Sequence, residues 1–227
     1  DLKAYEADMR HLIDTYIEAG GPRKISDFGE IGLLELIVKS GMAEAIGSLP
    51  NGIKNNKKAV AEVIANNVRS KIIKEHLNDP AFYDKMSVLL KEILDDLRAQ
   101  RIDYEAFLKR MADVAKQVQA GAADDTPEPL KKSPGLRAIF NQLERDLALA
   151  PAHALGEPPP AAYSGVIPGS SLDLALRIDA TIRSRKPDGW RGVLAKERVV
   201  KSLMHEILND AARVERLFLI IKAQSEY

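Results

Sequence analysis

The sequence predicts an all-α protein, an irregular multi-helix bundle in two lobes with about nine helices and no substantial sheet. Apolar residues recur at spacings of three and four along almost the whole chain, which is the period of an amphipathic helix. Sustained alternation of apolar and polar residues, which marks a strand, is nearly absent. Proline, glycine and capping residues separate the periodic stretches and place most helix boundaries.

The composition indicates a globular chain with a sizeable core. Of the 227 residues, 45% are hydrophobic and 29% are charged, which argues against global disorder. No apolar run approaches the roughly 18 residues that a membrane span needs. The chain has no cysteine, which excludes disulfides, thiolate nucleophiles and cysteine-held zinc and fits a reducing compartment, so we expect a cytoplasmic location. Its 33 basic and 33 acidic side chains balance, so contact with nucleic acid requires a local patch.

The first predicted lobe spans residues 1–120 and opens with a helix. The chain starts at Asp1 without a signal-peptide pattern, which indicates a piece of a longer polypeptide. Gly20, Gly21 and Pro22 end this first helix. Its apolar stripe consists of Leu2, Tyr5, Met9, Leu12, Ile13 and Tyr16.

A second and a third helix are expected before residue 50. Ser26 or Asp27 caps the second helix, and its nearly continuous apolar run over residues 31–38 predicts burial on most sides. A short helix follows around residues 42–46. The sequence Leu-Pro-Asn-Gly at residues 49–52 predicts a turn.

Three longer helices complete the first lobe. One spans residues 56–77 and carries its apolar residues on an inner face. Asp79 and Pro80 place a capping side chain before a proline at the first helical position, and Asp103 caps the last helix. Because the segment between these two capped helices is short, we expect them to pack as an antiparallel hairpin.

The second predicted lobe spans residues 134–227. A linker at 121–133 precedes it, where Ala, Asp, Pro and Lys replace the periodic pattern. Ser133 caps a helix that runs to about Leu149, and residues 151–170 hold five prolines and are expected to form a long proline-rich loop. Three helices follow, over residues 171–184, 195–208 and 210–224.

No catalytic motif assembles in the sequence. Gly47 and Gly52 have the spacing of a phosphate-binding loop, but Ile53 stands where that motif needs lysine, and no strand leads in. Asp188 and Glu197 have the order of nuclease carboxylates, but the lysine that completes such a site is missing. No two histidines have metal-ligand spacing; they are His11, His76, His153 and His205. The sequence therefore predicts a non-catalytic chain that holds no metal or cofactor itself.

The strongest local feature is a basic segment around the only tryptophan. Residues 177–201 hold eight basic and three acidic side chains, a net charge of +5 within a neutral chain. A turn that presents Trp190 among basic side chains can contact phosphate or a partner protein. An alternative stays open, because a tryptophan often anchors a loop to its own core and basic helix faces are usually solvated. The candidate contact residues are Arg183, Arg185, Lys186, Trp190, Arg191, Lys196, Arg198 and Lys201.

Several segments are distinctive as an ordered set, although each alone is a weak signal. They are RHLIDTYIEA at 10–19, LELIVKSG at 34–41, NNVR at 66–69, KIIK at 71–74, DP at 79–80, YDKMS at 83–87, DGWRG at 188–192, KE at 196–197, VER at 214–216 and QSEY at 224–227. Together they resemble the C-terminal region of the restriction (R) subunit of type I restriction-modification enzymes. The resemblance covers most of the chain and is weakest over residues 121–170.

The resemblance implies a fragment of a large ATP-dependent motor nuclease of bacterial defence. In that family a nuclease domain and two RecA-like helicase domains precede a helical C-terminal region, and the R subunit joins methyltransferase and specificity subunits. The assembled enzyme uses ATP and magnesium to translocate duplex DNA, and cleaves it when the recognition site is unmethylated. The family's catalytic motifs match no position here, so no catalytic residue is carried over. The resemblance therefore implies a module that docks the motor subunit to the methyltransferase and specificity core, or alternatively a domain that contacts DNA to guide translocation.

Overall fold

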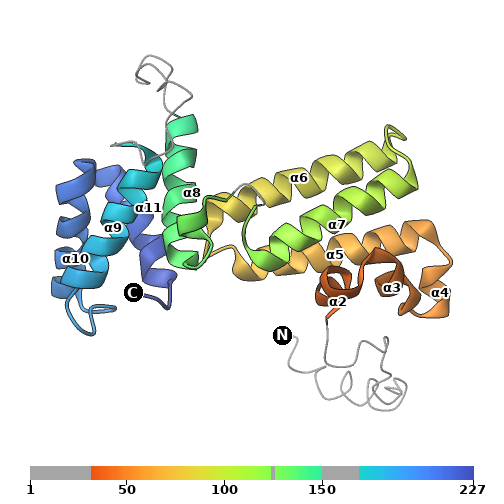
Figure 1. Ribbon diagram of the computed structural model, residues 1–227, viewed down its shortest axis with the longest axis horizontal. Coiled ribbons are helices and arrows are strands. Elements are labelled where there is room, and N and C mark those ends of the chain that lie inside the picture. The colour runs from red at the N-terminus through yellow and green to blue at the C-terminus, as the bar shows by residue number, and fades with distance from the viewer. Residues whose placement is uncertain (1–31, 124–125, 150–168) are drawn as a thin grey trace, which may run out of the picture.

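A computed structural model describes residues 32–123, 126–149 and 169–227 (Figure 1). In this part the chain forms ten α-helices and one turn of 3-10 helix, with no strand, which confirms the predicted all-α fold. The helix predicted at the start of the chain, the cap predicted at Ser26 or Asp27 and most of the loop predicted at 151–170 lie outside the described residues. None of the helices in the described ranges is long and apolar enough to cross a membrane.

Six helices form the first half of the described chain. They are α2 (Leu33–Ser40), α3 (Met42–Gly47), α4 (Asn51–Lys54), α5 (Lys57–Glu75), α6 (Pro80–Arg98) and α7 (Tyr104–Ala120). The turn predicted at 49–52 continues into α4. The carbonyl of Pro50 accepts hydrogen bonds from the amides of Ile53 at 2.8 Å and Lys54 at 3.0 Å, which closes one helical turn.

Side-chain caps fix where the long helices begin. The carboxylate of Asp79 accepts from the amide of Phe82 at 3.1 Å, and that of Asp103 accepts from the amide of Ala106 at 2.7 Å, as the sequence predicts. Helices α6 and α7 lie side by side as the expected hairpin (Figure 1), and Arg110 of α7 contacts Asp96 of α6 at 3.1 Å.

The second half of the described chain holds η2 (Glu128–Leu130), α8 (Pro134–Ala148), α9 (Ser171–Arg185), α10 (Leu194–Leu208) and α11 (Ala211–Ala223). Ser133, Ser170 and Asp210 cap α8, α9 and α11 through their side chains. Part of the segment predicted as a linker at 121–133 is packed, because Leu130 of η2 is fully buried among the side chains of the C-terminal helices.

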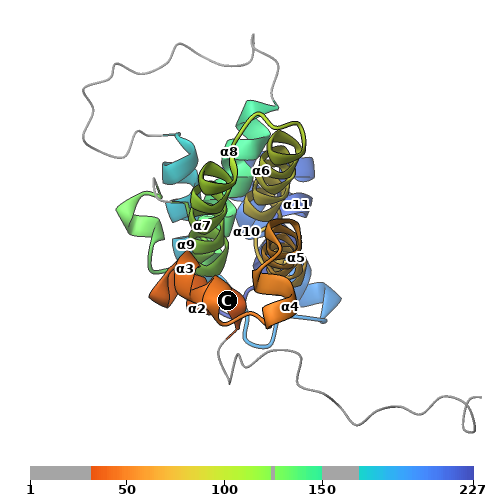
Figure 2. The ribbon, with the colours of Figure 1, turned by 90° about the vertical axis from the view of Figure 1, so that its right-hand side faces the viewer.

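Buried apolar side chains fall into two clusters. One joins α2, α3, α5, α6 and α7 and includes Phe107 and Met111; the other joins η2, α8, α9, α10 and α11 and includes Trp190 and Phe218. Figure 2, a view from the side of the first cluster, shows α5, α6 and α7 in front of the C-terminal helices. The division into lobes at residues 1–120 and 134–227 stays a prediction.

Polar contacts join the two clusters where α6 meets α8. The side-chain amide of Asn141 donates to Asp79 at 2.7 Å, and Arg145 pairs with Asp84 at 2.7 Å. The side-chain amide of Gln224, just after α11, donates to the backbone carbonyl of Asn78. These contacts hold the junction of α5 and α6 against α8 and α11, and so bring together the walls of a surface groove.

Candidate interaction site

Trp190, predicted as a contact residue, lies in the core of the C-terminal cluster. Its side chain is 2% exposed, and its ring centroid lies 5.7 Å from that of Phe218. The indole N–H is buried without a hydrogen-bond partner in the described part of the chain. The protein itself therefore covers the ring, so the expectation that Trp190 meets a partner or DNA at the surface is corrected. Burial of its large apolar area explains this position.

The loop that carries Trp190 is held by its neighbours. Gly189 and Gly192 adopt positive φ angles of 56° and 78°, which favour glycine. The carboxylate of Glu197 accepts from the amide of Gly192 at 2.8 Å and pairs with Lys222 at 2.7 Å. The bond from Lys222, and then that from the Gly192 N–H, lower the pKa of Glu197. Glu197 therefore anchors the loop rather than forming part of a nuclease site.

Two arginines of the predicted contact set are engaged within the chain. Arg183 pairs with Asp179 at 2.9 Å and with Glu226 at 2.7 Å. The guanidinium of Arg191 stacks over the Trp190 ring at 4.8 Å and donates to the carbonyl of Lys222 at 3.0 Å, at the end of α11. Both arginines thus tie the end of the chain to the C-terminal cluster.

Most of the other predicted contact residues have intramolecular partners as well. Arg185 pairs with Glu206 at 2.9 Å, and Lys201 pairs with Glu215 at 2.6 Å. Lys196 donates to the backbone carbonyl of Asp188 at 2.6 Å. Among the basic residues of the set, only Lys186 and Arg198 make no side-chain hydrogen bond or ion pair within residues 32–123, 126–149 and 169–227. The net charge of +5 over 177–201 therefore overstates the free positive charge, since three acids that pair with these cations, Glu206, Glu215 and Glu226, lie beyond residue 201.

Glu226 and Tyr227 bind the start of α8 and a side chain of α9. The carboxylate of Glu226 accepts from the hydroxyl of Ser133 at 2.6 Å and the amide of Gly135 at 2.9 Å. Burial raises the pKa of Glu226, but these bonds and the one from Arg183 outweigh it, so its pKa is lowered. The buried Tyr227 donates from its hydroxyl to Asp179 at 2.5 Å, and its pKa is raised, first by burial and then by this bond.

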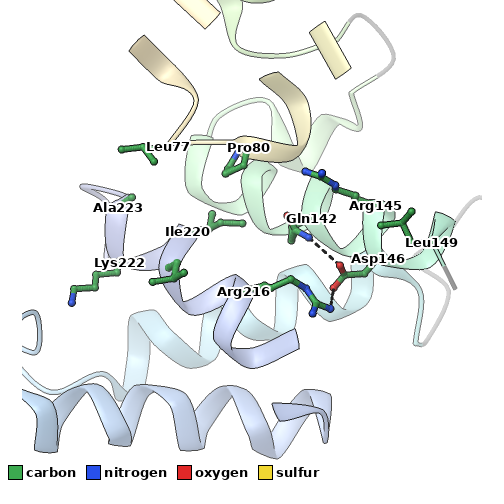
Figure 3. Close-up of a pocket in the computed structure, with 11 residues that line it drawn as sticks. Leu77, Pro80, Gln142, Arg145, Asp146, Leu149, Arg216, Ile220, Lys222 and Ala223 are labelled. Carbon is green, nitrogen blue, oxygen red and sulfur yellow. Dashed lines mark hydrogen bonds and ion pairs between the residues drawn. The ribbon is translucent and has the colours of Figure 1, made fainter. Parts of the chain in front are cut away.

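A groove of about 930 Å³ lies where the junction of α5 and α6 faces α8 and α11 (Figure 3). Three leucines from different elements line it and are largely exposed: Leu77 at 75%, Leu149 at 75% and Leu219 at 66%. Single exposed apolar residues are ordinary, whereas several in one groove mark an interaction site. The complete lining is Leu77, Pro80, Gln142, Arg145, Asp146, Leu149, Arg216, Leu219, Ile220, Lys222 and Ala223.

At the polar rim of the groove, Arg216 and Lys222 are more exposed than the carboxylates with which they pair. Asp146 is only 7% exposed, and it accepts from Gln142 and from Arg216, both at 3.0 Å, as the dashed lines in Figure 3 show. The Arg216 side chain is 48% exposed. Lys222 likewise pairs with Glu197; the Lys222 side chain is 39% exposed and that of Glu197 is 10% exposed. A molecule in the groove therefore meets N–H donors around an apolar floor.

No sequence pattern predicted this groove. Its residues come from three separate regions of the chain, and none belongs to the basic segment. One local signal points toward it: the five consecutive apolar residues 217–221 cannot all face one core from a single helix, so Leu219 turns outward.

In the part of the chain that the structure describes, no three or more His, Asp or Glu side chains are placed to hold a metal ion. Gly47 lies in α3 and Gly52 in α4, so these two glycines belong to helices rather than to a phosphate-wrapping loop. His76 contacts Asp84 at 2.8 Å, and the second oxygen of Asp84 pairs with Arg145, so these side chains connect the start of α6 to α8.

The fold and the groove define a helical chain with an apolar surface cleft. Comparison with known protein families, curated proteins and solved structures finds no match.

Proposed function

We propose that this chain is the C-terminal helical region of a type I restriction R subunit, and that it docks the motor subunit to the methyltransferase and specificity subunits. The observation that carries the proposal is the ordered set of segments that resemble that region, from residues 10–19 to 224–227. The exposed apolar groove supports a role in assembly, because such surfaces are typical of protein interaction sites.

The contacts of the described residues give several of these segments a physical role. Asp79 of the 79–80 segment caps α6 and holds α8, Trp190 of 188–192 fills the C-terminal core, and Glu226 of 224–227 caps the start of α8. In this proposal the resemblance reflects a shared fold rather than a shared catalytic site.

The proposal places nucleotide and metal chemistry in other domains. No residue of this chain matches the family's nucleotide-binding motifs, and the two-glycine segment at 47–52 is helical. ATP and magnesium would be used by the motor and nuclease domains of the parent protein in the cytoplasm, and this chain would supply attachment alone.

Assembly is the direct test. The purified 227-residue chain is mixed with a methyltransferase and specificity core, and association is measured by size-exclusion chromatography and calorimetry. We expect co-elution, and we expect excess chain to inhibit ATP-dependent DNA cleavage by competing with the complete R subunit for the core. Absence of both co-elution and inhibition would contradict the proposal.

Contact with duplex DNA is the second candidate, favoured by the basic side chains of Lys186 and Arg198, which have no ion-pair partner within the described residues. Two phosphate contacts predict a slope of about −2 for the logarithm of the binding constant against the logarithm of salt concentration. Binding to duplex DNA measured by fluorescence anisotropy at several salt concentrations tests this. A Lys186→Gln, Arg198→Gln double variant that binds DNA like the unsubstituted chain would rule these contacts out.

A further inference from the structure

The groove is apolar where three elements distant in the sequence converge. Leu77 follows α5, Leu149 follows α8 and Leu219 lies on α11, and all three expose most of their side chains. Ile220 is buried in the C-terminal cluster and also lines the groove. Because such apolar area is stabilised by removal from water, the groove favours an apolar occupant.

The groove also crosses the seam between the two clusters. Leu77 and Pro80 belong to the N-terminal half, whereas the remaining lining residues belong to α8, the residue after it, and α11. An occupant that fills the groove therefore touches both halves, which also meet through the Asn141–Asp79 and Arg145–Asp84 contacts. An occupant of this kind would stabilise the contact between the two clusters.

The charge on the rim selects among apolar occupants. Arg216 and Lys222 expose 48% and 39% of their side chains, whereas their partners Asp146 and Glu197 lie beneath at 7% and 10%. Arg145 is 43% exposed, and its partner Asp84, at 44%, lies outside the groove. An approaching chain meets cations first, so carboxylates beside its apolar residues are complementary to the rim. Duplex DNA is a poor match, because its phosphates would have to lie against exposed leucines.

We infer that the groove binds an acidic amphipathic segment of a partner protein, with apolar side chains on one face and carboxylates flanking them. This is the helix-in-groove mode of recognition, in which apolar anchors repeat every three or four residues. The identity of the partner rests on the proposed function, which assigns it to the methyltransferase and specificity core. The chemistry of the segment rests on the groove itself.

Leucine-to-aspartate substitutions test the groove in the whole chain. Leu219→Asp and Leu149→Asp place a carboxylate on the apolar floor and should each weaken association with the core by about tenfold or more. Leu194→Asp is the matched control, because Leu194 is 74% exposed on α10 and does not line the groove. Circular dichroism and Trp190 fluorescence check that each variant keeps its fold.

A charge substitution tests the rim. Arg145→Glu should slow association and weaken it more at low salt than at high salt. Arg98→Glu is the control, since Arg98 forms an exposed pair with Asp95 and lies outside the groove.

A photoreactive benzoylphenylalanine at position 219, with position 194 as control, identifies the occupant. We expect position 219 alone to crosslink to a core segment that carries apolar residues at helical spacing and at least two carboxylates. A crosslink to residues 1–31 or 150–168 of the same chain, to a second copy or to DNA would overturn the inference.

The outcomes separate this inference from the proposed function. If the unsubstituted chain associates with the core and all groove variants bind as tightly as their controls, the groove inference fails and the docking role stands. If the unsubstituted chain does not associate at all, both fail.

Discussion

Asn141 donates a hydrogen bond of 2.7 Å from its side-chain amide to the carboxylate of Asp79, and this contact ties α8 to the first turn of α6. The other oxygen of the same carboxylate accepts from the amide of Phe82, so one side chain caps a helix and joins two clusters. Burial raises the pKa of Asp79, while the bonds from Asn141 and the Phe82 N–H act in the opposite direction.

Replacement of Asp79 should therefore cost more than the loss of a helix cap. We expect Asp79→Ala to lower the free energy of unfolding by about 2 kcal/mol, because it removes a cap and the contact between α6 and α8. Asp103→Ala is the matched control: Asp103 caps α7 by a single bond at an exposed position, so about 1 kcal/mol is expected. Urea unfolding followed by circular dichroism measures both, and equal losses would contradict the joining role.

Glu226 should make stability depend on pH. Its pKa in the folded chain lies below the ordinary value of 4.5, so its contribution is present above that pH and is lost as the pH falls through the lowered value. We expect Glu226→Gln to cost about 1 kcal/mol at pH 7, because the pair with Arg183 is lost, and less as the pH falls below 4.5. Urea unfolding at several pH values measures the difference, and a difference that stays constant down to low pH would refute the assignment.

Gly135 should be sensitive to a single methyl group. A Cβ there would lie 2.8 Å from Cε2 of Tyr227, whose ring is buried and whose hydroxyl is bound to Asp179. We expect Gly135→Ala to destabilise the fold by about 1–2 kcal/mol. Gly52→Ala is the control, because a Cβ on that helical glycine meets nothing within 4 Å.

The same clash predicts coupling between two positions. In a Tyr227→Ala background, Gly135→Ala should cost little, since the ring it strikes is gone. A double-mutant cycle of unfolding free energies measures this coupling, and strictly additive effects would show that the clash is relieved without cost.

Trp190 should behave as a core residue. Trp190→Ala is expected to lower the free energy of unfolding by about 4 kcal/mol, as for large buried aromatic residues. Trp190→Phe should cost distinctly less, because it also removes a buried N–H that has no partner among the described residues. Thermal unfolding measures both variants; losses below about 0.5 kcal/mol for Trp190→Ala would indicate a surface role instead.

The helices of the described chain could be predicted because their signals are local. Asp79 before Pro80, Asp103 and Ser133 each accept from the amide three residues further on, so sequence order places these caps directly. The turn predicted at 49–52 was incomplete, because the carbonyl of Pro50 accepts from the amides of Ile53 and Lys54 and so begins α4.

The candidate site could not be predicted in the same way. Counting charge over 177–201 left out Glu206, Glu215 and Glu226, which pair with Arg185, Lys201 and Arg183. Long-range pairing of this kind follows from how helices pack, and spacing along the chain does not encode it.

Periodicity and capping act within a few residues, so the helical class, the starts of most described helices and the α6–α7 hairpin follow from residue order alone. Three further features appear only in the folded chain: Trp190 is buried, most cations around it have partners within the chain, and Leu77, Leu149 and Leu219 meet in one groove. Burial and charge pairing depend on which helix faces come together, and packing of the whole chain sets those faces.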